Sequence, residues 1–354
     1  MNIIQLTPGA GDMYCGNCLR DNALVAGYRR LGHDAIMVPL YLPLTLDEAD
    51  LSAGSPIFFG GINVFLDQKA SAFRSAPPWL RHWLSSPTLL RWLGRYAGKT
   101  RPADVAEMTL SMLRGESGNQ ARDLDEFMTW LRAQPRPDVL CISNALLLGM
   151  TQRLKAEIGA PIVCLLSGED AFLDAMPDPL RGEIWATLVD RARSVDAFIA
   201  PSRYFADRMA LRLQVSPDRV RVVPPGLNLA GFPTALRSAA PAPPVLGYFA
   251  RMNRDKGLDT VVEVFIRLRQ AGRIPGLKLK IGGSCGPADQ PFVASLRDRL
   301  HSVGLLGDVE FHPNLTRPAK IAFLASLSVF CVPALFGEAF GLYLLEAIDR
   351  KSVV

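Results

Sequence analysis

Two cationic side chains flank one predicted turn in the second half of the chain. Arg251 ends an apolar run that is typical of a buried strand, and Lys256 stands just before Gly257, where a helical pattern begins. An arginine binds phosphate oxygens through two donors at once, and a lysine adds a mobile point charge. Together they could neutralise much of the charge on a diphosphate. Considered alone, the segment is also compatible with a solvated turn.

Two carboxylates bracket a second predicted turn further along the chain. Glu338 follows an apolar strand pattern, and Glu346 stands in the next helical pattern, with seven residues (339–345) between them. Gly341 lets the backbone approach a ligand, and we expect the amides of Phe340 to Leu342 to be free donors of the first helical turn. Each acid alone is ordinary. Their combination with the Arg-to-Lys turn indicates a site for a ligand that carries phosphate and sugar hydroxyls.

The first loop of the chain carries weaker signals. Gly9 and Gly11 begin like a dinucleotide fingerprint, but the third glycine is missing at its expected place. A nicotinamide-dependent oxidoreductase would need the complete fingerprint. Cys15 and Cys18 have the spacing of a thioredoxin-like pair at a helix start, although the rest of the chain lacks a thioredoxin pattern.

Strand-like apolar runs alternate with helical patterns through most of the chain, which predicts an α/β fold with parallel sheets covered by helices on both faces. A helix is predicted from Ala145 to Ile158. In the first half, strands are predicted at 2–8, 34–40, 138–143, 161–166, 197–200 and 220–223. In the second half, strands are predicted at 245–250, 277–282, 309–312 and 328–333, and helices at 258–270, 292–303 and 318–327.

This pattern predicts two doubly wound, Rossmann-like domains. Residues 233–244 contain four prolines and no strong periodicity, so they are expected to form a linker between a domain at 1–232 and a domain at 245–354. The second domain has only four predicted strands and one unfinished helix, which is small for a doubly wound sheet. We therefore expect it to be incomplete and the chain to be truncated at its C-terminus.

An insertion near residues 71–115 interrupts the first domain. Between Ser71 and Lys99, aromatic and leucine side chains alternate with arginines and a histidine. Such a segment either packs its aromatic side chains on the domain, lies on an anionic bilayer surface or lines an acceptor site.

Composition restricts the class of protein. The chain has 354 residues, 49% hydrophobic content, 21% charged content and a net charge of +5, as in ordinary folded proteins. We expect no signal peptide and no membrane-spanning helix, because no basic residue precedes the first apolar run and no run of about 18 apolar residues occurs. Four of the six cysteines stand singly among apolar or glycine-rich neighbours, which suits a reducing compartment. We expect a cytoplasmic protein that does not bind nucleic acid.

With these residues in place, the chain resembles the Glu-x7-Glu group of retaining GT-B glycosyltransferases, family 4. The resemblance covers nearly the whole chain. Besides the Glu338 to Glu346 segment, it rests on Gly32-His33-Asp34 and on Asp196 to Ser202, which is similar to the family's Asp-x-hydrophobic-x-x-x-Ser strand end. Val223 to Gly226 is similar to its Pro-Asn-Gly turn, with Pro225 where asparagine is usual.

The resemblance implies two domains facing a cleft and transfer of a sugar from a nucleoside-diphosphate sugar with retention of anomeric configuration. Arg251 and Lys256 would contact the donor diphosphate, and Glu346 the ribose hydroxyls. Glu338 would be the catalytic member, facing the transferred sugar together with the amides of Phe340 to Leu342. No protein nucleophile is evident, and front-face attack through an oxocarbenium-like transition state is implied.

The resemblance also indicates which metals, cofactors and partners to expect. No metal and no separate cofactor are expected, and Gly9 and Gly11 would let the first loop approach the acceptor and the donor phosphates. The acceptor is unidentified; the aromatic and basic insertion suggests a lipid-linked acceptor or a cell envelope polysaccharide, with peripheral contact at the inner membrane face. One departure matters. Many relatives carry a histidine near the donor sugar, whereas this chain has none from Leu166 to Asp170. Either Glu169, Asp170 or backbone replaces it, or the chain binds nucleotide or a lipid surface without catalysis.

Overall fold

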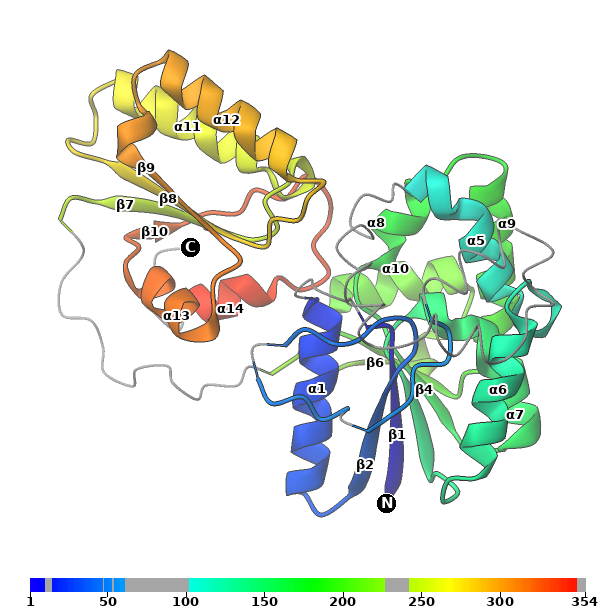
Figure 1. Ribbon diagram of the computed structural model, residues 1–354. Helices are drawn as coiled ribbons and strands as arrows, with labels where there is room; N and C mark the ends of the chain where they lie inside the picture. Colours follow the sequence, from blue (N-terminus) through cyan, green and yellow to red (C-terminus); the bar gives the residue numbers. More distant parts are fainter. Residues whose placement is uncertain (10–14, 47, 53, 61–101, 227–241, 349–354) are drawn as a thin grey trace. The chain divides into compact units, whose positions relative to one another are not determined.

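The computed structural model describes residues 1–9, 15–46, 48–52, 54–60, 102–226 and 242–348. The chain divides into two compact units, Met1–Pro225 and Gly226–Val354 (Figure 1). Most of the predicted linker, together with residues 71–101 of the predicted insertion, lies outside the described residues. Each unit contains one parallel sheet with helices on both faces, which confirms the prediction of two Rossmann-like domains.

The first unit is built on a six-stranded parallel sheet in the order β2-β1-β3-β4-β5-β6. Its strands are β1 (Asn2–Thr7), β2 (Asp34–Pro39), β3 (Val139–Ile142), β4 (Ile162–Leu165), β5 (Ala197–Ala200) and β6 (Val220–Val222). All six were predicted, to within one residue at each end. The apolar runs are reliable signals because strands of a parallel sheet are buried on both faces and read as continuous hydrophobic segments.

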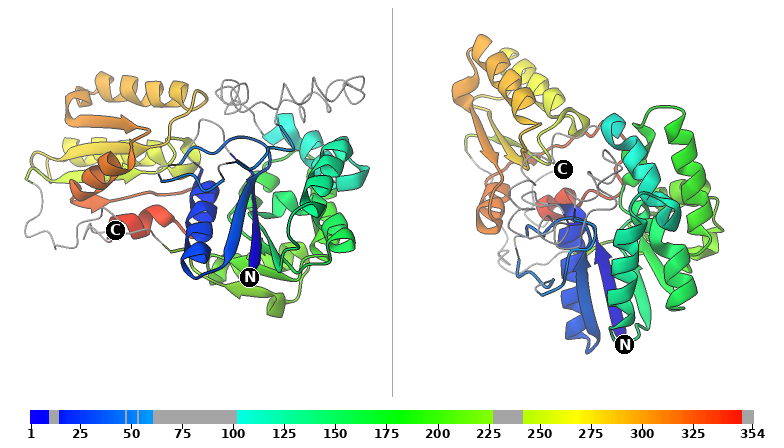
Figure 2. Two further views of the ribbon diagram at one scale, coloured as in Figure 1. Left: turned by 60° about the horizontal axis from the view of Figure 1, so that its bottom comes forward. Right: turned by 45° about the vertical axis from the view of Figure 1, so that its right-hand side comes forward.

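Helices cover both faces of this sheet. They are α1 (Gly16–Arg30), α5 (Pro102–Leu113), α6 (Ala121–Arg132), α7 (Thr151–Glu157), α8 (Glu169–Asp174), α9 (Leu180–Ala192) and α10 (Arg203–Leu213). Figures 1 and 2 show the strands between α1 on one side and α6 with α7 on the other. Ile3 of β1, Val25 of α1 and Met37 of β2 belong to one buried cluster. This packing fixes the start of α1 beside the end of β1.

The second unit has a four-stranded parallel sheet in the order β10-β7-β8-β9. Its elements are β7 (Val245–Phe249), α11 (Leu258–Gln270), β8 (Lys278–Gly283), α12 (Gln290–Ser302), β9 (Val309–Pro313), α13 (Arg317–Ala325), β10 (Val329–Phe330) and α14 (Leu342–Ile348). In Figures 1 and 2, α11 and α12 cover one face of the sheet, and α13 and α14 cover the other.

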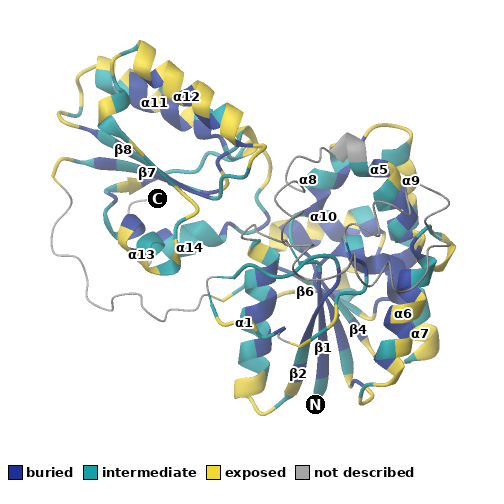
Figure 3. Ribbon diagram, viewed as in Figure 1, coloured by how far each residue is buried: buried dark blue, intermediate teal, exposed yellow. Residues whose placement is uncertain are grey.

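Burial in the second unit follows the hydrophobic periodicity. On α11, Leu258, Val261 and Phe265 are at most 2% exposed, and they form a core with Leu279 and Ile281 of β8. The outward sides of α11 and α12 are exposed (Figure 3). The buried face anchors α11, so its first residues are held against the end of the sheet.

Two predicted elements differ here: the strand predicted at 328–333 is shorter, β10 (Val329–Phe330), and one predicted helix is divided. The helix expected from Ala145 to Ile158 is split into a 3₁₀ helix, η3 (Ala145–Met150), followed by α7. Asn144 caps η3, since its side chain accepts a hydrogen bond from the amide of Leu146 at 3.0 Å. A methyl group on Gly149 would lie 2.0 Å from the carbonyl oxygen of Met112. The tighter 3₁₀ turn therefore accompanies a close backbone contact with α5, which the local sequence pattern does not show.

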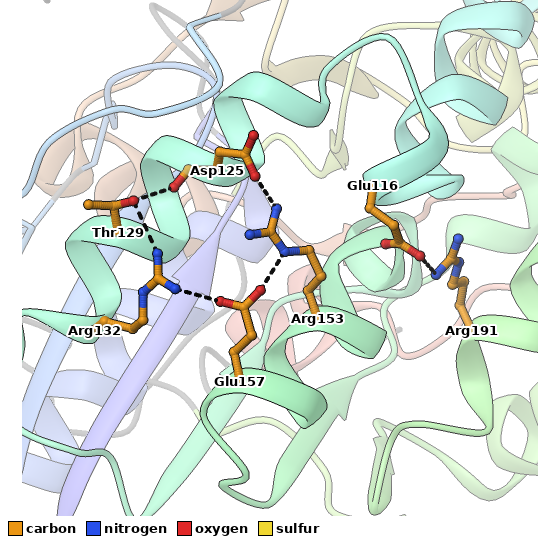
Figure 4. A network of polar contacts seen from close by, with 7 residues as sticks. All are labelled: Glu116, Asp125, Thr129, Arg132, Arg153, Glu157 and Arg191. Atoms are coloured by element: carbon orange, nitrogen blue, oxygen red, sulfur yellow. Dashed lines mark hydrogen bonds and ion pairs between the residues drawn. The ribbon is translucent and has the colours of Figure 1, made fainter.

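A surface network ties α6 to α7 in the first unit (Figure 4). Arg153 of α7 pairs with Asp125 of α6 and with Glu157, the latter at 2.7 Å, and Arg132 reaches Glu157 at 3.1 Å. Such exposed pairs contribute about 0–1 kcal/mol each.

Among the described residues, no helix combines the length and the apolar character needed to cross a bilayer.

Candidate functional site

The strand order of the second sheet places the two predicted turns side by side. From β7 the connections run through β8 to β9 on one side, and the next connection returns to β10 on the other side of β7. The β10–β7 pair is therefore the point at which the strand order switches. In open parallel sheets ligands bind beyond the carboxyl ends of the strands at this kind of switch point. The turn with Arg251 and Lys256 follows β7, and the loop with Glu338 follows β10. The structure therefore brings together segments that are far apart in sequence.

Close backbone contacts join these two loops. Gly257 has φ +70°, and a methyl group there would lie 2.0 Å from the carbonyl oxygen of Pro333. The amide of Leu335 also donates to the carbonyl oxygen of Asp255 at 2.9 Å. Only a glycine permits both the left-handed conformation and this approach. The loop after β10 is thus packed directly on the turn after β7.

Lys256 and Glu338 form an ion pair at the centre of this arrangement. The hydroxyl of Tyr343 on α14 donates to the same oxygen of Glu338, Oε2, at 2.8 Å. Burial, and the hydrogen bond to Glu338, raise the pKa of Tyr343, so its hydroxyl stays a donor. The Lys256 ammonium also lies 4.9 Å from the centre of the Phe336 ring. With side chains 19% and 28% exposed, Lys256 and Glu338 are partly shielded from water.

Arg251 is positioned by a buried carboxylate. Its Nε lies 3.2 Å from Oδ2 of Asp289, and its Nη2 lies 3.2 Å from Oδ1. Asp289 also accepts the amide of Gly286 at 3.0 Å, and its side chain is 8% exposed. The Arg251 side chain is still 49% exposed. Asp289 thus orients the guanidinium group while leaving it accessible to an anion.

Glu346 lies on α14 and pairs with Lys320 of α13 at 3.0 Å. The two side chains are 16% and 12% exposed, so this carboxylate is less accessible than Glu338. Glu338 and Glu346 therefore have different cationic partners, Lys256 and Lys320.

The predicted start of the last helix is wrong by two residues. We expected the helical turn to begin at Phe340, but α14 begins at Leu342. Gly341 has φ +79°, a left-handed conformation that cannot continue a right-handed helix. The amides of Phe340 and Gly341 therefore precede the helix instead of belonging to its first turn. Gly341 is buried, with Cγ of Glu338 at 3.4 Å from where its methyl group would stand.

Of the two glycines predicted to let the first loop approach a ligand, the structure describes Gly9. Gly9 has φ +76°, and a methyl group there would lie 1.8 Å from the carbonyl oxygen of Leu42. Its lack of a side chain is therefore required by the unit's own backbone. Gly11 lies outside the described residues.

The loop without the family's histidine uses its two carboxylates internally. Glu169 accepts hydrogen bonds from the amides of Ala145 at 3.0 Å and Ser167 at 2.7 Å, and burial raises the pKa of Glu169. Asp170 is paired with Arg208 of α10. Glu169 thus ties the segments after β3 and β4 together, and both acids are buried.

Three residues of the site, Asp289, Tyr343 and Lys320, were not predicted from the sequence. Tyr343 could have been found, because it stands within the interval between Glu338 and Glu346. Asp289 is separated from Arg251 by 38 positions and Lys320 from Glu346 by 26, with no local signal for either pairing.

Two protein families match the chain, one in each unit. The family described as Glycosyltransferase Family 4 matches residues 104–230. The family described as Glycosyl transferases group 1 matches residues 237–354, which include every site residue of the second unit named above.

Curated relatives cover about half of this chain. The D-inositol 3-phosphate glycosyltransferase of Mycobacteroides abscessus is 30% identical over 181 residues, which make up 48% of this chain and 38% of that protein. The protein of the same name from Pseudarthrobacter chlorophenolicus is 30% identical over 179 residues, 48% of this chain and 41% of that protein. The match thus spans about two fifths of the length of these relatives.

Solved structures share the fold over almost the whole chain. HepE of Anabaena in complex with UDP has a TM-score of 0.61 at 15% identity, covering 99% of this chain and 79% of that one. Sucrose-phosphate synthase from Thermosynechococcus elongatus has a TM-score of 0.65 at 15% identity, with the same coverage. Such low identities establish the fold alone. Residues 104–230 are thus similar to family 4 glycosyltransferase domains and residues 237–354 to group 1 glycosyltransferase domains, and the fold is that of the two solved structures.

Proposed function

We propose that this chain transfers a sugar from a nucleoside-diphosphate sugar to an acceptor, with retention of anomeric configuration and without a bound metal or separate cofactor. The observation that carries the proposal is the ion pair between Lys256 and Glu338 at the switch point of the second sheet. Lys256 belongs to the turn that begins with Arg251, and Glu338 belongs to the loop after β10. This pairing supports the proposal, because it combines cations with a neighbouring carboxylate at the edge of the sheet where phosphate ligands are expected to bind.

The chemistry follows from where charge develops. As the bond from the anomeric carbon to the diphosphate oxygen breaks, negative charge grows on the diphosphate and positive charge on the sugar ring. Arg251 and Lys256 would stabilise the leaving diphosphate, because fixed cations in a partly dry site need little rearrangement. Glu338 would face the sugar ring. The acceptor oxygen attacks the face from which the diphosphate leaves, and its proton passes to the departing oxygen.

Glu346 is assigned to the ribose hydroxyls. A carboxylate has about four acceptor positions, so Glu346 can keep its contact with Lys320 and still accept hydrogen bonds from two hydroxyls. Lys320 would then fix its orientation.

The names of the similar proteins suggest which substrates to test first. HepE was solved with UDP, and the curated relatives are named for D-inositol 3-phosphate. We therefore propose a uridine diphosphate sugar as donor and a phosphorylated polyol as acceptor. A lipid-linked acceptor or an envelope polysaccharide, with contact at the inner membrane face, is the alternative. Binding to liposomes of anionic lipid would support that alternative, and its absence would remove the membrane contact.

A donor screen tests the proposal directly. Release of nucleoside diphosphate is measured for uridine, guanosine and adenosine diphosphate sugars, with and without polyol phosphate. We expect one donor to be consumed, the rate to be unchanged by a chelator, and NMR to show the donor's anomeric configuration in the product. An inverted product would refute retention, and loss of turnover in the chelator would refute metal independence. If no donor is consumed and no nucleotide binds, the transfer itself is wrong.

A further inference from the structure

Two cysteines of the first unit, Cys15 and Cys18, have no part in the proposed transfer, and both stand at the start of α1. Cys15 immediately precedes the helix in an extended conformation, and Cys18 lies in the first helical turn. Cys18 is fully buried, whereas Cys15 is half-buried. The hydroxyl of Thr7, at the end of β1, lies 4.0 Å from the Cys18 sulfur.

This environment makes Cys15 the more reactive partner. The Cys18 thiol lowers the pKa of Cys15 to about 7, helped by the backbone amides of Cys18 and Asn17 and opposed by burial and the carboxylate of Asp21. The hydrogen bond to Cys15, together with burial, raises the pKa of Cys18, while the Thr7 hydroxyl acts in the opposite direction. Near neutral pH the pair therefore presents a half-buried thiolate at Cys15 and a protonated thiol at Cys18. Reactive cysteines in helix-start pairs have this asymmetry.

The other four cysteines lack it. Burial raises the pKa of Cys141 to about 12 and that of Cys164 further above its ordinary value. Burial also raises the pKa of Cys285 and Cys331 in the second unit. The thiolate is the form that reacts, so a selective oxidant is expected to meet Cys15 first.

We propose that Cys15 and Cys18 form a reversible disulfide by exchange with a low-molecular-weight disulfide. The Cys15 thiolate attacks one sulfur of the small disulfide, an S–S bond forms to Cys15, and the other half leaves as a thiolate. Cys18 then loses its proton to solvent, and its sulfur attacks Cys15 and expels the second small thiolate. Both leaving thiolates can take up protons. The two cysteines are oxidised, and one small disulfide is reduced to two thiols.

The position of the pair gives the disulfide a consequence for the fold. In the order β2-β1-β3-β4-β5-β6, β2 and β3 lie on opposite sides of β1, which makes the β1–β3 pair a switch point. The end of β1 and the start of α1 therefore lie at the ligand edge of the first sheet. Oxidation replaces a negative charge at that edge with a neutral bridge. The redox state of the pair therefore changes the charge at this edge of the sheet, for any ligand that binds there.

The test uses the whole chain and oxidised glutathione. The reduced protein is incubated with glutathione buffers of increasing oxidised fraction, quenched by alkylation and mapped by mass spectrometry. We expect a Cys15–Cys18 disulfide in the wild-type protein. Cys18→Ser should instead accumulate glutathione on Cys15, and Cys15→Ser should leave residue 18 unmodified. In the wild-type protein, the alkylation rate of Cys15 should rise to half its maximum near pH 7.

Cys285→Ser is the matched control, because this half-buried cysteine of the second unit should not affect the result. Circular dichroism verifies that each variant is folded. Glutathione found on Cys285 or Cys331 while Cys15 stays reduced would overturn the proposal. So would the absence of a Cys15–Cys18 disulfide at every glutathione ratio in folded protein. These readouts are masses and rates of thiol reaction, so they remain informative if the proposed sugar transfer fails.

Discussion

Each cation of the candidate donor site is already held by a carboxylate before any ligand arrives. Asp289 holds Arg251, and Glu338 holds Lys256. These contacts fix side chains that would otherwise lose considerable rotamer freedom on binding, so the site is preorganised for an anion. The same contacts mean that removal of a lysine exposes a partly shielded glutamate to an incoming phosphate. Binding should therefore depend strongly on the lysine.

Lys256→Ala is expected to weaken binding of a nucleoside diphosphate about 10- to 100-fold. Hydrogen bonds to charged groups contribute about 1.5–3 kcal/mol, and the unpaired Glu338 adds repulsion. Isothermal titration or the ligand-induced rise in melting temperature measures this. Lys278→Ala is the control, because Lys278 pairs with Asp308 at the start of β8, the opposite end of the strands. Equal losses in the two variants would argue against the assigned role.

Asp196 predicts a pH dependence of stability. Its carboxylate accepts the amide of Ile162 and the ammonium of Lys155, both at 2.7 Å. Although burial opposes them, these contacts lower the pKa of Asp196 below its ordinary value. A lowered folded-state pKa means that the stabilisation is present above the unfolded pKa of about 3.9 and is lost as the pH falls through the folded value.

Asp196→Asn should therefore unfold at lower urea concentration than the wild-type protein at pH 7, and the difference should shrink below about pH 4. Urea unfolding at several pH values measures it. Asp207→Asn, at an exposed position of α10, is the comparison and should show little change. A difference that stays constant down to pH 3 would show that the pKa of Asp196 is not responsible.

Among the elements, the loops after β7 and β10 form the site only because their backbones touch. Gly257→Ala should disrupt this contact, since the new methyl group would lie 2.0 Å from the Pro333 carbonyl oxygen. Gly272→Ala is a matched control with φ +62° and no atom within 4 Å of the methyl position. Both variants bear a strain of about 1–2 kcal/mol from the left-handed backbone.

Urea unfolding and nucleotide titration separate the two effects. We expect Gly257→Ala to lose more stability than Gly272→Ala and to bind nucleoside diphosphate more weakly, while Gly272→Ala binds like the wild-type protein. If both variants lose the same stability and keep full binding, the close loop contact has no part in forming the site.

The elements themselves were largely predictable, because each depends on a local hydrophobic period. Strands such as β1 and helices such as α11 appear at their predicted positions. The predictions that failed depend on contacts between residues far apart in the sequence. The helix η3 depends on a contact of Gly149 with α5, and the positions of Asp289 and Lys320 depend on the order of the strands in the sheet. The left-handed Gly341 delays the start of the last helix to Leu342, and the role of Gly341 toward a ligand remains a prediction. Neither the roles of Glu338 and Glu346 nor the domain boundaries at 233–244 are decided by local pattern.

For the whole molecule, the site residues of the second unit predict where a nucleotide acts. Hydrogen exchange with and without nucleoside diphosphate should show protection concentrated in residues 250–257 and 331–346, because ligand binding suppresses local opening of the segments it contacts. Lys256→Ala should reduce that protection. Protection confined to Met1–Pro225 would place the nucleotide elsewhere and contradict the assignment.

The order of the second sheet also affects how the site is made during synthesis. Lys256 and Glu338 are 82 positions apart, because the strand that completes the switch point, β10, follows β7, β8 and β9 in the sequence. At about 5–20 residues per second, a ribosome needs roughly 4–16 s to add that stretch. Throughout this interval the emerging lysine has no glutamate partner. Nucleotide binding should therefore be absent from stalled nascent chains that end before β10 and appear only after α14 has left the ribosome.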